Sequence, residues 1–139
     1  MATLMAIIVI IVLFVIFDHI IYWKRISDFE RRANEFVVMF NILSNKVLHG
    51  DPNFPDTDEF IFDGDIYKNV TVKKGDFASF YSILSKCIKD VLDSYEKIGE
   101  RYLSLMDDET EEWIYGLHMR VEEISNTIRY QSWLINGIE

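Results

Sequence analysis

Residues 2–23 read ATLMAIIVIIVLFVIFDHIIYW, and this apolar stretch organises the rest of the chain. As a helix its 22 residues would extend about 33 Å, enough to cross a hydrocarbon core of about 30 Å. The stretch lacks the preceding basic residues and the small-residue cleavage pattern of a secretory signal peptide. The sequence therefore predicts an uncleaved, single-span transmembrane anchor over residues 1–23.

Basic residues follow the span at once and set its expected orientation. Because Lys and Arg near a span favour the cytoplasmic side, we expect the N-terminus outside and the C-terminal domain in the cytoplasm. The two aromatic residues at the end of the span suit the headgroup level, where amphipathic rings are favoured. The predicted membrane interface comprises Tyr22, Trp23, Lys24, Arg25, Arg31 and Arg32.

Asp18 and His19 are the polar exceptions within the span. A carboxylate deep in a bilayer is costly and often marks a functional site. These two residues precede Lys24 by only six and five positions, which favours a hydrated place near the cytoplasmic headgroups. The alternative is that they line a pore or an oligomer contact, so they are candidate intramembrane polar residues.

The rest of the chain is strongly acidic. The 139 residues have a formal net charge of −9, and from Asp51 onward there are 9 Lys and Arg against 19 Asp and Glu. Such a surface repels phosphates, so we expect no nucleic-acid partner. The single cysteine, Cys87, excludes an internal disulfide and fits a reducing compartment. It lies in an apolar helical stripe, which favours a buried thiol over a reactive one.

Heptad spacing predicts three helices in the cytosolic domain, residues 24–139. No Gly or Pro interrupts the first, residues 24–48. Its apolar seam comprises Ile26, Phe29, Ala33, Phe36, Phe40, Leu43 and Val47. Between Phe36 and Leu43 the apolar face is wider than a two-stranded coiled coil needs, which indicates packing against two or more helices.

The other two helices are expected at residues 76–106 and 108–136. The seam of the second has no interruption and comprises Phe77, Tyr81, Leu84, Ile88, Val91, Tyr95, Ile98, Tyr102 and Leu105. Asp108 followed by Glu111 resembles an acidic capping box at the start of the third helix. Because the connection between these helices is short, we expect an antiparallel three-helix, coiled-coil-like bundle.

Residues 49–75 form a long acidic connection between the first two cytosolic helices. Strand-like patterns flank the Asp63-Gly64 dipeptide, which is typical of a two-residue type I′ turn. Such a turn would pair Phe62 with Asp65 in a short β-hairpin. The alternative is an irregular lid across the helices.

No catalytic or cofactor-binding motif is present, so we expect no enzyme, no cofactor and no metal site. The acidic connection does not follow the ligand spacing of an EF-hand loop, because an Asp stands where the loop requires Gly. His118 and Glu122 are four positions apart on a helix, and we interpret them as an exposed hydrogen-bonded pair. An enzyme with an unrecognisable site is a further hypothesis.

The leading hypothesis is a membrane-anchored, non-enzymatic interaction module: an adaptor, scaffold or regulatory subunit. Its acidic surface implies a protein partner with a basic surface, or self-association. The candidate partner-binding residues are Asp56, Asp58, Glu59, Asp63, Asp65, Trp113 and Trp133. The alternative, motivated by Asp18 and His19, is an oligomeric pore-forming or membrane-perturbing protein of the holin or toxin class.

Overall fold

The computed structural model describes residues 2–49, 59–73 and 77–136, and their side chains except those of residues 46–49 and 132–136. Most of this part of the chain lies in three helices: α1 (Ala2–His49), α2 (Phe77–Leu105) and α3 (Asp108–Asn136). The strands β1 (Glu59–Phe62) and β2 (Val70–Lys73) form one antiparallel pair. A mainly helical fold with a small hairpin is therefore confirmed.

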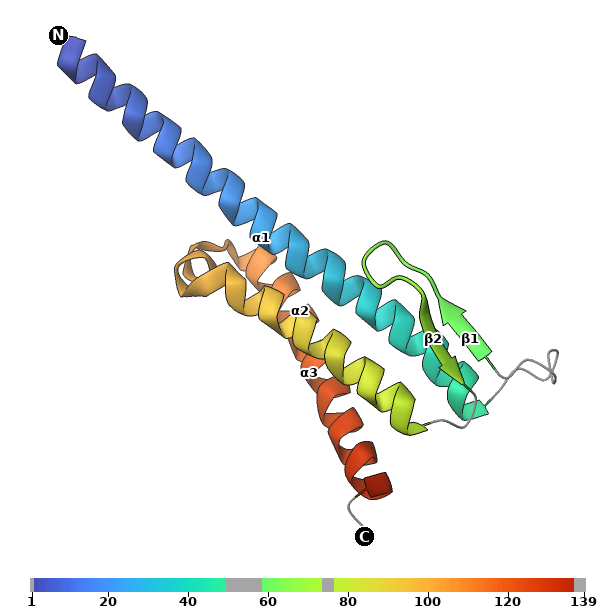
Figure 1. The fold of residues 1–139 in the computed structure, drawn as a ribbon. Helices are drawn as coiled ribbons and strands as arrows, with labels where there is room; N and C mark the ends of the chain where they lie inside the picture. The colour runs from blue at the N-terminus through green and yellow to red at the C-terminus, as the bar shows by residue number, and fades with distance from the viewer. Residues whose placement is uncertain (1, 50–58, 74–76, 137–139) are drawn as a thin grey trace.

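The N-terminal half of α1 extends away from all other elements as a bare helix (Figure 1). From Leu4 to Phe17 its large apolar side chains are exposed. In the described part of the chain, α1 is the one helix long and apolar enough to cross a membrane. Exposed apolar surface of this extent is unfavourable in water. None of the other described elements covers this half of α1.

The second half of α1 forms one wall of the core. The buried residues on it are Ile26, Phe29, Ala33, Phe36, Met39 and Leu43. The seam expected from the sequence is confirmed from Ile26 to Leu43, except that Phe40 is only half-buried and Met39 is fully buried instead. The side chain of Val47, its last expected member, lies outside the described residues. The buried arc is wider than one seam because α1 contacts α2, α3 and both strands.

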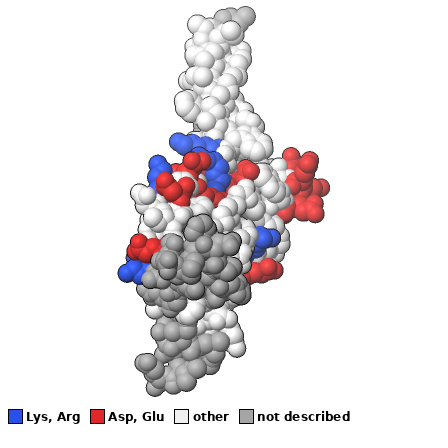
Figure 2. Space-filling model, turned by 90° about the vertical axis from the view of Figure 1, so that its right-hand side faces the viewer, with Lys and Arg blue, Asp and Glu red and all other residues white. Residues whose placement is uncertain are grey.

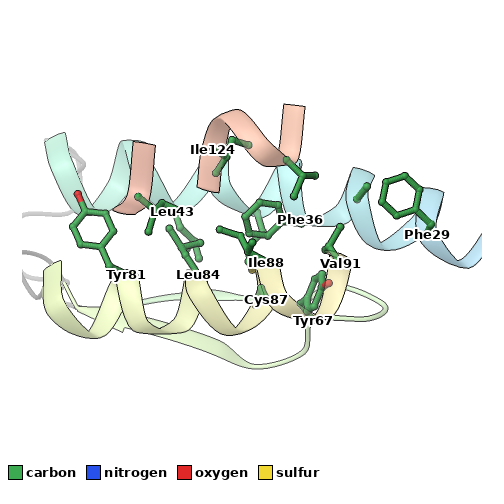
Figure 3. Close-up of a cluster of buried hydrophobic side chains, with 14 of the residues drawn as sticks. Phe29, Phe36, Leu43, Tyr67, Tyr81, Leu84, Cys87, Ile88, Val91 and Ile124 are labelled. Atoms are coloured by element: carbon green, nitrogen blue, oxygen red, sulfur yellow. The ribbon is translucent and has the colours of Figure 1, made fainter. Parts of the chain in front are cut away.

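The other elements fold back along this second half. Figure 1 shows α2 running in the opposite direction beside α1, with α3 turning back beside α2 and the hairpin covering another side. Figure 3 shows how the core is filled: Phe36 and Leu43 of α1 point toward Leu84 and Ile88 of α2. Tyr67, from the hairpin loop, closes this layer beside Val91.

Gly99 interrupts α2, which the sequence pattern predicted to be continuous to residue 106. Its backbone has φ 83° and ψ 152°, a conformation that residues with a Cβ rarely adopt. After this break Met106 is buried, whereas Leu105, expected in the seam, is 62% exposed. The break therefore sets the direction of the last turn of α2, which carries Arg101 and Tyr102.

α3 begins one residue after its cap, and the cap is Asp107 rather than the expected Asp108. The Thr110 N–H donates to Asp107 Oδ1 at 2.7 Å, and the Glu111 N–H donates to the Asp107 carbonyl. These bonds satisfy donors that the first helical turn leaves free. The hydrogen bond from Thr110 lowers the pKa of Asp107.

The hairpin has a different register from the one expected. Phe62 pairs with Val70, not with Asp65, so the loop spans residues 63–69 instead of two residues. The reason lies on α1: the Glu35 carboxylate accepts the backbone N–H groups of three loop residues, Asp65, Ile66 and Tyr67. A carboxylate that binds successive amides holds the loop open where a type I′ turn would close it.

Candidate functional site

Asp18, the carboxylate inside the apolar half of α1, contacts the end of α2. Arg101 Nη2 donates to Asp18 Oδ2 at 2.7 Å, and the Tyr102 hydroxyl donates to Asp18 Oδ1 at 2.5 Å. The Asp18 side chain is 23% exposed. Both carboxylate oxygens therefore have a donor from the same chain, 83 and 84 positions away.

Tyr102 is the centre of this contact. Its ring lies edge-on to Tyr22, with ring centroids 5.7 Å apart. The guanidinium carbons of Arg25 and Arg101 lie 5.3 and 5.2 Å from its ring centroid, within the range of cation–π attraction. The hydrogen bond to Asp18, followed by burial, raises the pKa of the Tyr102 hydroxyl, so it remains a proton donor at neutral pH. We call Asp18, Tyr22, Arg101 and Tyr102 the anchor joint.

His19 does not join Asp18 in this contact. The Trp23 indole N–H donates to His19 Nε2 at 3.0 Å, one helical turn away on α1. Both side chains are exposed, Trp23 to 44%. The two candidate intramembrane polar residues thus have separate partners: Asp18 binds Arg101 and Tyr102 of α2, and His19 pairs with Trp23 of α1.

The basic residues that follow the apolar half of α1 separate into two groups. Lys24, Arg25 and Arg31 line a hollow of about 610 Å³ together with Lys97 of α2. Arg32 instead binds Asp28 at 3.1 Å and Asp90 of α2 at 2.6 Å. Since it is half-buried and paired twice, Arg32 stabilises the packing of α1 on α2 and does not belong to the basic surface expected at the membrane.

The described part of the acidic connection carries three of the acidic residues expected to bind a partner. Glu59, Asp63 and Asp65 are exposed, and Asp63 Oδ1 accepts the Asn69 N–H at 3.3 Å. That bond holds Asn69 at a positive φ of 53° just before β2. Asp56 and Asp58 lie outside the described residues. Trp113 is exposed on α3, whereas the side chain of Trp133 lies outside the description.

The remaining candidates for chemistry are packed into the helical domain. His118 Nε2 lies 3.6 Å from Glu122 Oε1, so the two residues pair as expected. The expected exposure is wrong for His118, which is half-buried and stacks on Tyr95 with ring centroids 3.9 Å apart. Cys87 is buried, as expected, and burial followed by the charge of Asp90 raises its pKa to about 11. In residues 2–49, 59–73 and 77–136, no three metal-binding side chains converge.

The sequence pattern did not identify three residues with long-range roles. Arg101 binds Asp18, Glu35 binds the amides of the hairpin loop, and Lys97 adds a positive charge to the hollow between α1 and α2. The only local signal was Gly99, a glycine inside a helical pattern, which can mark a break. Comparison with models of protein families, with curated proteins and with solved structures found no match.

Proposed function

We propose that this chain is a single-pass, membrane-anchored, non-enzymatic interaction module, with its N-terminus outside and its helical domain at the cytoplasmic face. The observation that supports it best is the anchor joint, where Arg101 and Tyr102 bind Asp18. An unbroken helix and a second, lateral contact connect the anchor to the domain. Such a connection fixes the height and tilt of an antiparallel helical bundle above the bilayer, which suits an adaptor, scaffold or regulatory subunit.

From the joint we also infer how deep the proposed span lies in the bilayer. Residues 2–17 precede it and would extend about 24 Å as a helix, less than a hydrocarbon core of about 30 Å. The boundary of the bilayer then falls at the joint, where Trp23 and Leu105 are exposed beside it. Local thinning of the bilayer, or entry of these two side chains into the headgroup layer, makes up the difference.

The outer face of α3 is the partner-binding surface that we favour. Tyr115 and Met119, one helical turn apart, are 57% and 41% exposed. Exposed Glu112 and Glu123 lie one turn before and one turn after them. Tyr and Met are enriched at protein interfaces, and the flanking carboxylates favour a basic rim on the partner. The partner is therefore a protein whose surface has an apolar centre and basic surroundings.

Orientation is tested at the sequon Asn69-Val70-Thr71, whose asparagine is exposed. Expressed in a eukaryotic cell, the chain should resist alkaline extraction from membranes and carry no glycan. The control is a variant with Lys24→Glu and Arg25→Glu, which removes the basic flank and should turn some chains over, so that a glycan appears. A glycan on the parent chain, or release by alkaline extraction, contradicts the proposed topology.

Partner binding is tested by replacing Tyr115 with a photo-crosslinking amino acid in the full chain and irradiating native membranes. We expect a discrete adduct of higher mass that disappears when Met119→Glu is added. The matched position is Thr71, exposed on β2, which should give no such adduct. Equal adducts from both positions, or none from Tyr115, would argue against a binding face on α3.

The pore hypothesis predicts that Asp18 faces a water-filled lumen. In this structure Arg101 of the same chain neutralises Asp18, so a charged lumen is not needed to accommodate it. Reconstituted full-length protein should therefore leave vesicles impermeable to ions. Leakage that disappears in the variant Asp18→Leu, His19→Leu would favour the pore instead.

A further inference from the structure

The hollow between α1 and α2 gathers positive charge at one level of the molecule. Its lining residues are Ile21, Lys24, Arg25, Ser27, Asp28, Arg31, Ser94 and Lys97. Figure 2 shows Lys and Arg side chains, with carboxylates among them, where the apolar stem of α1 meets the helical domain. The volume, about 610 Å³, lies in the range of roughly 300–1,000 Å³ that is typical of ligand sites.

Four cations face this hollow, and most of them are not neutralised within the protein. In the described part of the chain, Lys24, Arg31 and Lys97 form no ion pair. Its single carboxylate, Asp28, already binds the Arg32 guanidinium. The hollow is therefore net positive on a chain whose formal net charge is −9. Like charges held close together are unfavourable unless an anion lies among them.

We propose that this hollow binds a phosphate group, and that the group belongs to the head of an anionic phospholipid. This inference rests on the membrane anchor of the proposed function. Lys and Arg are the side chains that bind phosphate oxygens, and exposed Ser27 lines the same space. The Ser94 hydroxyl is already bound to the Val91 carbonyl at 2.6 Å. A soluble phosphate compound offers the same chemistry to the cations and is the other source to be distinguished.

The position of the hollow favours the lipid. Ile21, on its wall, continues the exposed apolar surface of α1, and Lys24 follows one turn later. A phospholipid could place its phosphate among the cations while its acyl chains follow the apolar stem. Basic pockets beside a span on the cytoplasmic side are known to hold anionic headgroups. The acidic remainder of the domain would be repelled by the same lipids, so the hollow would set which side approaches the membrane.

The test uses full-length protein in detergent, titrated with short-chain phosphatidic acid, short-chain phosphatidylcholine or inorganic phosphate. Lys97→Glu is the informative variant because this residue is exposed on α2 and does not flank the span. Lys86→Glu, exposed on the same helix outside the hollow, is the matched control with the same change of charge. One unit of charge changes anionic-lipid affinity about fivefold, so Lys97→Glu should weaken phosphatidic acid binding about 25-fold. The control should change it by less than about threefold on the same scale.

Each outcome bears on the inference. Binding of phosphatidic acid above that of phosphate and phosphatidylcholine, lost in Lys97→Glu, supports a lipid headgroup site. Equal binding of inorganic phosphate and phosphatidic acid, both lost in that variant, supports the phosphate pocket and refutes the lipid as its source. Affinities that are the same in both variants, or no binding at all, overturn the inference. The titration in detergent does not depend on the membrane anchor, so the two proposals can fail separately. If alkaline treatment extracts the chain from membranes but the chain still binds phosphate, the anchor is refuted and the phosphate pocket is not.

Discussion

Removing the Glu35 carboxylate should release the hairpin loop without unfolding the helices. Its oxygens accept the N–H groups of Asp65, Ile66 and Tyr67, the last two at 2.8 and 3.2 Å. A hydrogen bond to a charged group contributes about 1.5–3 kcal/mol when buried. The carboxylate is half-exposed and the freed amides can bind water, so for the three bonds together we expect about 2–3 kcal/mol, well below their sum.

The measurement is amide hydrogen exchange of the full chain in detergent micelles, comparing the parent with Glu35→Ala. Alanine is the best helix former, so α1 itself is not weakened. A loss of 2–3 kcal/mol in local stability corresponds to a fall of about 30- to 150-fold in the protection of the three loop amides. Amides of α2 and α3 should keep their protection, because the core does not depend on these bonds.

The control is Glu30→Ala, the same substitution on the same helix, at a carboxylate with no hydrogen bond to the hairpin among the described contacts. It should leave the loop amides as protected as in the parent. If protection of residues 65–67 is unchanged in Glu35→Ala, or falls equally in Glu30→Ala, the assignment of the loop conformation to Glu35 is wrong.

Three further predictions concern the helical core. Phe36→Ala removes a side chain that is 0% exposed and should lower the free energy of unfolding by about 3–5 kcal/mol, measured by denaturant titration; a loss below about 1 kcal/mol would contradict its place in the core. Gly99→Ala forces a Cβ into a backbone at φ 83° and ψ 152° and should cost about 1–3 kcal/mol in the same assay, whereas a gain in stability would show that α2 has no break there. Cys87 should react slowly with iodoacetamide near pH 8 and fast once unfolded, since its folded pKa is about 11. Because that pKa is raised from 9.0, the contribution of the thiol to stability is complete below about pH 9 and is lost as pH rises toward 11; rapid modification of the native protein would refute its burial.

The helices were predictable because their signals are local. The apolar half of α1 and the spacing of Ile26, Phe29 and Phe36 follow from neighbours within two turns, and these residues are buried as expected. The three-four alternation of apolar residues records which face of a helix avoids water. It contains no information on the partners of polar side chains, and it led us to extend α2 through Gly99 without a break.

The register of the hairpin could not be predicted from the residues near the turn. The Asp63-Gly64 dipeptide correctly indicated that the chain reverses, but the register depends on Glu35, about thirty positions earlier and on another element. A turn motif indicates which conformation the local backbone prefers in the absence of tertiary contacts. A carboxylate from α1 that binds three loop amides outweighs the modest preference of a dipeptide for one turn type.

By itself the sequence determined the apolar stem, the three helices, the buried Cys87 and the acidic character of the domain, because each depends on composition or on spacing along one element. Only the tertiary structure decided that Asp18 binds Arg101, 83 positions away, and that Lys97 joins the cations of α1. Charged residues on a helix surface have many alternative partners of similar energy, about 0–1 kcal/mol each, so no pattern in the chain selects one. The selection is made by the packing of α2 on α1 and by the break at Gly99, which together bring the end of α2 to Asp18 in the apolar half of α1.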